Sequence, residues 1–320
     1  MGISLSCWPR GASSAKPRQL MDSIPDLDYV ISFLREAEGA RGRLVRLNAV
    51  ADTILSRYPY PEPVARLLGE LLLVAAMLGA NLKQEGIFTI QLRGQGRVPL
   101  LVVDAAYGGQ LRGFADIAEG ASFDKPSYSP AELVGKDSYL AITFDPGEGL
   151  QRYQGVVALE GDSIIDALVN YFTYSQQLDV LFKLALEKRA SGWVAGGFML
   201  ERMPGEGGTA APTGDEAEEG WRSSLALAGT LKEEELLDPL LDGNALLYRL
   251  FHEDGVRVYP PRALTTGCRC SRARIHDLLL SMPIEDRADM VVDGSISVHC
   301  QFCNTTEKFA PDEVGLQGMQ

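Results

Sequence analysis

The pattern of hydrophobic and polar residues predicts one long core helix near the start of the chain. Leu27–Leu34 is an apolar stretch that fits an opening strand or helix, and Arg43–Leu47 mixes charged and apolar residues as a half-buried strand does. Ala49–Arg57 has a helical pattern that ends at a cluster of prolines. Val64–Lys83 is rich in leucine and alanine and is apolar on more than one side. A helix of this kind belongs in the centre of a core.

The period of the pattern then changes to that of β-strands. Segments with strand character are Phe88–Arg93, Leu100–Asp104, Leu111–Phe114, Tyr139–Asp145, Gln151–Leu159 and Trp193–Leu200. Gly94-Gln95-Gly96 fits a hairpin turn better than a phosphate-binding loop, because no third glycine or following helix completes it. Ser163–Thr173 is predicted to be a helix, and Ser175–Arg189 is a further element of undetermined type. Strands followed by flanking helices predict an α+β fold with an N-terminal α/β layered core.

An acidic, glycine-rich segment, Gly205–Gly220, interrupts this pattern and contains no large apolar side chain. Such a composition predicts a flexible linker or surface loop. Trp221–Phe251 is helical again and is divided into short helices by Pro239 and Gly243. If its leucines pack only against the first unit and the C-terminal segment, they would be uncovered when that segment unfolds.

We therefore predict four parts along the chain. They are an extension over residues 1–20, a core domain over 21–204, an acidic loop with a helical linker over 205–254, and a small metal-binding domain over 255–320. The extension is predicted to be disordered and lacks the apolar centre of a secretory signal. Met21 is an alternative start to Met1.

Charge and composition exclude several classes of partner. The net charge is −13 and the isoelectric point about 4.8, so the surface repels phosphate backbones and anionic membranes. The most apolar run, Leu71–Leu82, is too short to span a bilayer. The chain has only five cysteines, which fits a reducing compartment better than a secreted disulfide scaffold.

Four of the cysteines form two close pairs near the C-terminus, Cys268-Arg-Cys270 and Cys300-Gln-Phe-Cys303. Each pair offers two thiolates from one turn, and together they predict a tetrahedral site for one zinc ion per chain. Four thiolates leave no open coordination position, so a catalytic zinc is not favoured. We find no Ser-His-Asp or Cys-His arrangement in the sequence, and we do not expect an enzyme. His276 and His299 are expected at the surface or behind the ligands.

The cysteine pattern alone leaves two roles open, a structural zinc staple and a redox switch. A structural zinc contributes on the order of 10–16 kcal/mol. Two disulfides that close such short rings contribute about 1.5–2 kcal/mol each. The difference is as large as the stability of a typical domain, so oxidation would unfold this segment. Arg269, Arg272 and Arg274 either favour reactive thiolates or only balance the charge of a four-thiolate zinc site.

Motifs along most of the chain resemble those of the redox-regulated bacterial holdases known as the 33 kDa chaperonin family. The resemblance extends from Asp22 to Val314 and includes the spacing of the four cysteines. The other matching segments are Arg41–Leu47, Leu67–Leu72, Tyr171-Phe172, Ser175–Leu178, Gly196–Leu200, Leu250–Glu253 and Val256–Val258. The first twenty residues, with Cys7, and the acidic segment 205–220 depart from the family pattern.

The resemblance implies a cytoplasmic, ATP-independent chaperone that is inactive when Cys268, Cys270, Cys300 and Cys303 are reduced and hold zinc. Oxidation would pair Cys268 with Cys270 and Cys300 with Cys303, release the zinc and unfold the C-terminal domain and linker. The exposed surface would then bind unfolding client proteins under oxidative and heat stress, and the active form would be a homodimer. The surface that binds clients is not identified by the sequence.

Two competing hypotheses remain. One is a constitutive zinc-stabilised interaction module, whose zinc and partner binding ignore the redox state. The other is an enzyme with a structural zinc, which would need a concave cluster of acid and base residues in the first unit. Cys7 adds a separate complication, because it could form intermolecular disulfides in an oxidised sample.

Overall fold

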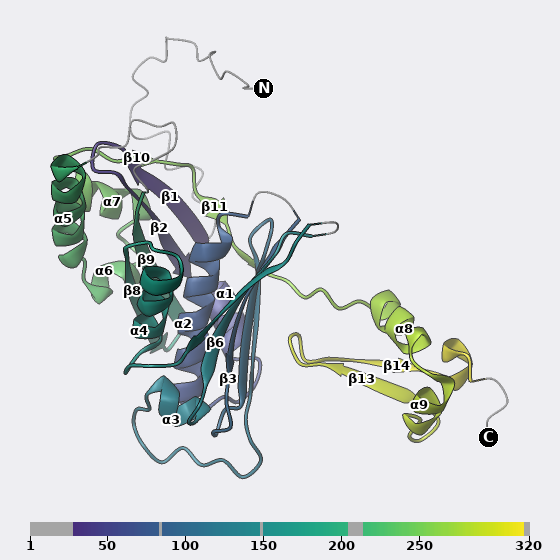
Figure 1. Ribbon diagram of the computed structural model, residues 1–320. Helices are drawn as coiled ribbons and strands as arrows, with labels where there is room; N and C mark the ends of the chain where they lie inside the picture. Colours follow the sequence, from purple (N-terminus) through teal and green to yellow (C-terminus); the bar gives the residue numbers. More distant parts are fainter. Residues whose placement is uncertain (1–27, 83–84, 148–149, 204–213, 317–320) are drawn as a thin grey trace, which may run out of the picture.

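The computed structural model describes residues 28–82, 85–147, 150–203 and 214–316, and these residues fold into two large sheets, a group of linker helices and a small C-terminal unit (Figure 1). The expectations for the extension over residues 1–20, for Cys7 and for the start at Met1 or Met21 lie outside the described residues. The α+β prediction is confirmed.

The first sheet is antiparallel throughout its four long strands. In spatial order they are β1 (Tyr29–Arg35), β2 (Ala40–Leu47), β9 (Gly192–Arg202) and β8 (Val180–Arg189). The second sheet is also antiparallel in its long strands. These are β5 (Gln110–Asp116), β4 (Leu100–Ala106), β3 (Ile87–Arg93), β6 (Tyr139–Asp145) and β7 (Tyr153–Ala158).

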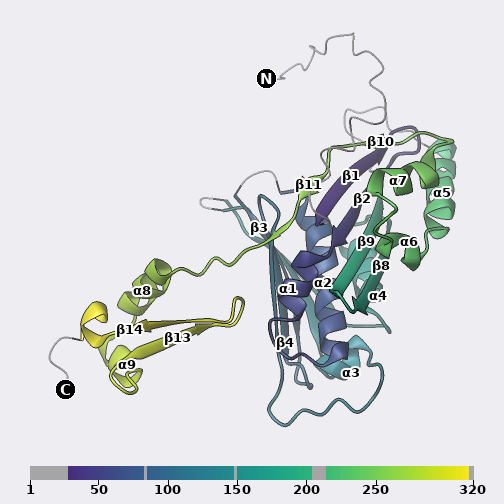
Figure 2. The same ribbon diagram turned by 180° about the vertical axis from the view of Figure 1, so that it is seen from behind.

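Helix α2 (Glu62–Gly79) lies between the two sheets and contacts strands of both (Figure 2). Pro63 occupies its first turn, where a missing backbone donor costs nothing. Nearly every side chain from Val64 to Met77 is buried, because apolar sheet faces cover the helix from both sides. The shorter helices around this core are α1 (Ala49–Leu55), α3 (Pro130–Val134) and α4 (Ile164–Asn170), the last continued by a π turn over Tyr171–Ser175.

Three linker helices cover the other face of the first sheet: α5 (Asp215–Gly229), α6 (Glu233–Leu237) and α7 (Gly243–Phe251). Phe251 is buried among the aromatic side chains of the sheet, with ring centroids 5.6 Å from Phe33 and 6.4 Å from Phe198. Arg35 of β1 is also fully buried here and donates hydrogen bonds to Ser224 and Asp254. The linker is therefore part of a second hydrophobic core.

A short extended segment, residues 257–266, follows the linker helices, and we call it the strap. Its strands β10 (Arg257–Val258) and β11 (Arg262–Ala263) pair with β1, and β12 (Thr265–Thr266) pairs with β5. The strap thus lies along one edge of each large sheet. These residues pair with the core sheets before the chain reaches the cysteines.

The C-terminal unit has a small core of its own. It contains α8 (Arg272–Ser281), α9 (Ile284–Asp289), the hairpin of β13 (Ile296–Cys300) and β14 (Thr305–Phe309), and a 3₁₀ turn over Pro311–Val314. Its fully covered side chains are Ile275, Leu279, Ile296, Phe309, Val314 and Leu316. A core of this size gives little stability without a staple.

Several local predictions need correction. Residues 215–220, expected in a loop, form the first turns of α5, where Asp215, Glu216 and Glu218 stabilise the positive end of the helix dipole. Residues 204–213 lie outside the described residues. Strand β2 is buried rather than half-buried, since its charged side chains are paired: Arg43 with Glu201 at 3.0 Å, and Arg46 with backbone carbonyls of α6 and the residue after it.

The linker helices should depend on Phe251 for their attachment to the first sheet. Replacing Phe251 by alanine should destabilise the protein by about 3–5 kcal/mol, because it opens a cavity in a closed aromatic cluster. Tyr248 lies on the same helix but is 66% exposed. The control Tyr248→Ala should change stability by less than about 0.5 kcal/mol. Urea unfolding measures both, and equal effects would contradict the assignment.

Candidate metal centre

The four paired cysteines come together from two separate turns of the C-terminal unit. Cys268 and Cys270 precede α8, whose first turn is capped by the side chain of Ser271. Cys300 ends β13, and Cys303 lies in the tight turn that leads into β14. The hairpin and the capped helix therefore fix one pair each, and the packing of the unit brings the pairs together.

The four sulfur atoms all lie within 4.8 Å of one another. The Sγ–Sγ distances are 3.1 Å for Cys268–Cys270, 3.3 Å for Cys270–Cys303 and 3.6 Å for Cys268–Cys300. A zinc ion with bonds of about 2.3 Å needs tetrahedral sulfurs separated by about 3.8 Å. The donor set fits zinc, and the closest sulfur atoms would move apart by less than about 1 Å to hold the ion.

The metal-free thiols compete for protons. A hydrogen bond with Cys268 and then burial raise the pKa of Cys270 well above its ordinary value, and burial raises the pKa of Cys300. Burial also opposes ionisation of Cys303, but hydrogen bonds with the Thr305 side chain and with the other thiols lower its pKa to about 6. One thiolate stabilised by neighbouring S–H groups is the arrangement expected when four thiols share a site without a cation.

The histidines near the cysteines have other partners. His276 Nε2 lies 2.9 Å from the carbonyl of Glu313, and His299 lies 3.2 Å from the Tyr58 hydroxyl and 3.0 Å from that of Thr306. The metal-binding group found among the described residues consists of the four cysteines alone. Both histidines therefore have hydrogen-bonding partners outside the sulfur cluster.

The arginines around the first pair bind oxygen atoms. Arg272 contacts Glu307 and Glu313, and Arg274 donates to the carbonyl of Arg269. The contacts of Arg272 join α8 to β14 and to the 3₁₀ turn within the C-terminal unit. Arg269 instead extends out of the unit towards the core.

Arg269, between the two cysteines of the first pair, reaches a buried carboxylate of the second large sheet. Its guanidinium lies 2.6 Å from Asp104 Oδ2. The same oxygen accepts from Arg112 at 2.6 Å, and the other oxygen accepts from Thr89 at 2.6 Å. The side chain of Asp104 is 5% exposed, so this contact joins the centre to the core through a desolvated charge.

The second cysteine turn also docks on the core. The ring of Phe302 lies under the guanidinium of Arg112 at 4.0 Å and beside Phe114 at 6.4 Å between centroids. Tyr58 donates to the carbonyl of Gln301 at 3.0 Å, and Arg57 donates to that of Phe302. Both cysteine turns therefore touch the core domain through the residues that separate the cysteines.

The core side of this contact is not evident from the sequence. Asp104 ends an apolar stretch whose pattern predicts only a strand, and Arg57 and Tyr58 follow a helix pattern without any sign of a site. A charged residue at the end of an otherwise apolar strand is the one available signal. Its partner is 165 positions away, so no local pattern could reveal the pair.

Comparison with known proteins decides the family. The family model described as Hsp33 protein matches residues 28–310. The chain belongs to the Hsp33 family. The 33 kDa chaperonin of Pseudomonas fluorescens strain SBW25 is 39% identical over 296 residues, which cover 92% of this chain and 94% of that protein. The 33 kDa chaperonin of Caulobacter vibrioides strain NA1000 / CB15N is 38% identical over 305 residues, which cover 91% and 99%.

A solved structure supports the fold of this Hsp33 family member. The crystal structure of the 33 kDa chaperonin (heat shock protein 33 homolog) from Thermotoga maritima matches with a TM-score of 0.73, covers 90% of this chain and 96% of that chain, and is 22% identical. The names of the relatives identify chaperones, and family membership supports chaperone function for this chain. Among the helices of the described residues, none combines the length and the apolar character that crossing a bilayer requires.

Zinc binding to the reduced Hsp33 centre should strengthen steeply as pH rises. The raised pKa values of Cys270 and Cys300 keep both thiols protonated near neutral pH without metal, so zinc binding must release at least these two protons. The apparent dissociation constant should fall by at least about 100-fold per pH unit between roughly pH 6.5 and 7.5, tenfold for each proton released. Competition with a chelator of calibrated pH dependence measures this dissociation constant. An affinity that does not change with pH would contradict the prediction that Cys270 and Cys300 are protonated without metal.

Removing the Arg269 contact should make the centre easier to oxidise. In Arg269→Gln the Asp104–Arg112 pair remains, but the first cysteine turn loses its charged attachment to the core, worth about 1.5–3 kcal/mol. Peroxide should then release zinc about tenfold faster, followed with a colorimetric chelator. Arg66→Gln is the control, since it removes an arginine whose ion pair with Glu62 is exposed on the core domain. Equal rates for the two variants would refute a role for docking.

Proposed function

We propose that this Hsp33 family member is a redox-regulated, ATP-independent holdase that binds unfolding proteins and prevents their aggregation under oxidative and heat stress. In the reduced form Cys268, Cys270, Cys300 and Cys303 hold one zinc ion and the protein is inactive. Oxidation converts the four thiols into two disulfides and releases the metal. The C-terminal unit then unfolds and exposes binding surface.

The observation that carries this proposal is the contrast between the cysteine cluster and the small core around it. The unit over residues 268–316 buries six apolar side chains in its own cluster. Zinc contributes on the order of 10–16 kcal/mol to a domain of this type. Losing the metal therefore removes the dominant stabilising interaction of the unit, and the new disulfides replace only a small part of it.

We propose that the disulfides are Cys268–Cys270 and Cys300–Cys303, as the family resemblance implies. The sulfur distances permit the pairs Cys270–Cys303 and Cys268–Cys300 as well, since all four atoms lie within 4.8 Å. Sequence separation favours the local pairs once the unit has unfolded. Cysteines in one turn stay close in an unfolded chain, whereas closing a loop of about thirty residues costs more entropy.

The unfolding of the unit would act on the linker through the docking contacts. Phe302 and Arg269 attach the two cysteine turns to the core, and the strap connects directly to Cys268. Once these attachments are lost, the strap and the linker helices have fewer restraints, and their apolar side chains become available. We propose that the zinc-binding switch domain spans residues 255–320, so that it includes the strap, and that the oxidised form is a homodimer in the cytoplasm.

Peroxide combined with mild heat should convert the zinc-loaded chain into an active chaperone. We expect loss of about one zinc per chain, loss of far-UV circular dichroism signal and suppressed aggregation of a chemically denatured client in light scattering. The Cys7→Ser background prevents stray intermolecular disulfides from imitating dimerisation. Reduction in the presence of zinc should reverse all three signals.

Two outcomes would contradict the proposal. Full activity with zinc bound and thiols reduced would remove the switch. Zinc that survives peroxide, with partner binding unchanged, would favour a constitutive zinc-stabilised interaction module. Peptide mapping of the oxidised chain by mass spectrometry tests the disulfide pairs separately.

A further inference from the structure

The strap lies along the outer edge of β1 in place of a full strand. Val258 and Arg257 pair with Phe33 and Leu34, and Arg262 and Ala263 pair with Val30 and Tyr29. The amide of Tyr259 donates to the carbonyl of Ser32 at 2.9 Å, and the amide of Leu264 donates to that of Asp28 at 2.9 Å. The edge of β1 is therefore covered by two short ladders with a break between them.

The break is caused by Pro260 and Pro261, which have no backbone N–H to donate. A strand without proline could form an uninterrupted antiparallel ladder along all of Tyr29–Arg35. The strap is thus an incomplete partner for an otherwise apolar strand. An edge occupied by a weak partner can be taken over by a better one.

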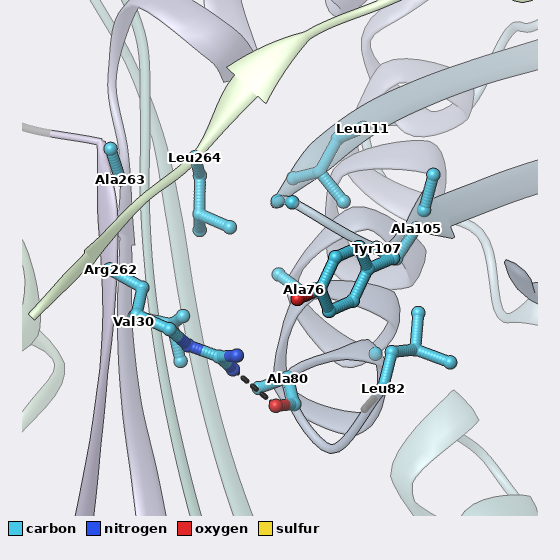
Figure 3. Close-up of a pocket in the computed structure, with 14 residues that line it drawn as sticks. Val30, Ala76, Ala80, Leu82, Ala105, Tyr107, Leu111, Arg262, Ala263 and Leu264 are labelled. Carbon is cyan, nitrogen blue, oxygen red and sulfur yellow. Dashed lines mark hydrogen bonds between the residues drawn. The ribbon is translucent and has the colours of Figure 1, made fainter. Parts of the chain in front are cut away.

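Packing beneath the strap is also incomplete. A cavity of about 390 Å³ lies between the strap, the end of α2 and the β4–β5 turn. Figure 3 shows the side chains of Val30, Arg262 and Leu264 around this cavity, opposite Ala76, Leu82 and Leu111. Arg262 extends across it and donates to the carbonyl of Ala80. An exposed arginine thus occupies a position where an apolar side chain would bury more surface.

We propose that the outer edge of β1 and the cavity beside it form the client-binding groove, and that the bound partner is an extended apolar segment of an unfolding protein added as an antiparallel strand. The strap occupies this groove in the resting state. This inference rests on the proposed function, because oxidation must first release the strap. The proposed groove specifies where clients bind and which client segments fit, namely extended segments that can pair with β1 through their backbone.

Recognition through backbone hydrogen bonds suits a chaperone with many clients, since every residue except proline offers the same donor and acceptor. The cavity adds a preference for apolar side chains at alternate positions. By contrast, no strand of the described residues pairs with the outer edge of β7, and Tyr153 and Val156 on it are already exposed in the resting structure. Tyr153 and Val156 would therefore need no oxidation to become accessible to a client.

The geometry of an antiparallel strand gives a sharp test. The backbone of Val30 faces the strap, and its side chain faces the cavity. Likewise, the backbone of its partner Arg262 faces β1, and the side chain of Arg262 faces the cavity. A client strand with apolar side chains in the cavity must therefore turn the amides of those same residues towards β1. The amides of the intervening polar residues point away.

The probe is a fluorescent octapeptide of alternating valine and threonine with a lysine at each end. Its affinity for the oxidised Cys7→Ser chain is measured by anisotropy. N-methylation of the valine amides should weaken binding by about tenfold or more, because each methyl group removes a donor that faces β1. The same number of methyl groups on the threonine amides should leave binding within about twofold. Equal effects of the two modifications would overturn the proposal.

Hydrogen exchange locates the bound peptide. The amides of Val30, Ser32 and Leu34 should lose protection on oxidation and regain it when the unmodified peptide binds. Protection that returns only elsewhere, for example on β7, would overturn the proposal. Ser32→Pro, which removes one edge donor, should weaken peptide binding, and Ser32→Ala is its control.

A second pair of variants tests the groove without oxidation. A Cβ on Gly109 would clash with the carbonyl of Ala263 in the strap, whereas a Cβ on Gly108 would meet nothing within 4 Å. Both glycines have positive φ, so Gly108→Ala carries the same backbone strain without the clash. The reduced, zinc-bound Gly109→Ala chain should bind the octapeptide more tightly than Gly108→Ala.

These experiments distinguish failure of the groove from failure of the redox switch. If oxidation fails to release zinc or to suppress aggregation, the proposed function is wrong, and the reduced Gly109→Ala chain still tests the groove. If aggregation is suppressed but the two methylated peptides bind equally, the redox switch stands and the groove is wrong.

Discussion

The four cysteine sulfur atoms lie within 4.8 Å of one another, and we propose that this crowding decides whether the C-terminal unit and the strap stay folded. Four thiolates repel one another at this distance without a cation, and hydrogen bonds between the thiols together with burial raise the pKa values of Cys270 and Cys300. We propose that zinc removes this conflict and in doing so holds together a unit whose own core is too small to be stable alone. The centre is then both the strongest stabilising interaction of the C-terminal unit and its most easily removed one.

The position of the centre makes its loss matter for the rest of the chain. Arg269 and Phe302 lie between the paired cysteines, and both contact the second sheet, through Asp104 and Arg112. On the N-terminal side, Cys268 follows the strap, which lies along edges of both large sheets. The strap joins the cysteine turn covalently to the edge of β1, so unfolding that begins at the cysteines can extend directly to that edge. The buried helix α2 has no such connection and is expected to keep its structure.

Features with a local pattern could be predicted from the sequence. The uniform apolar character of Val64–Lys83 predicted the central helix, and the two close cysteine pairs predicted that the four cysteines come together, because paired thiols at close spacing have few other uses. Features that depend on distant partners could not be predicted. The burial of Arg43 is possible only because Glu201 lies opposite it, and the pairing of the strap with β1 joins residues more than two hundred positions apart. The loop prediction for Asp215–Gly220 was wrong because acidic residues fit a helix start as well as a loop.

Segment-resolved hydrogen exchange during zinc removal from the reduced chain is the most decisive measurement, because a chelator takes the metal without adding disulfides. We predict that residues 257–266 and 268–316 lose protection in the same kinetic step as zinc leaves, while α2 stays fully protected. Retained protection of the C-terminal unit after the metal has left would contradict this, since the unit would then be stable without zinc. Protection lost in that unit but kept in the strap would show that the two are not coupled.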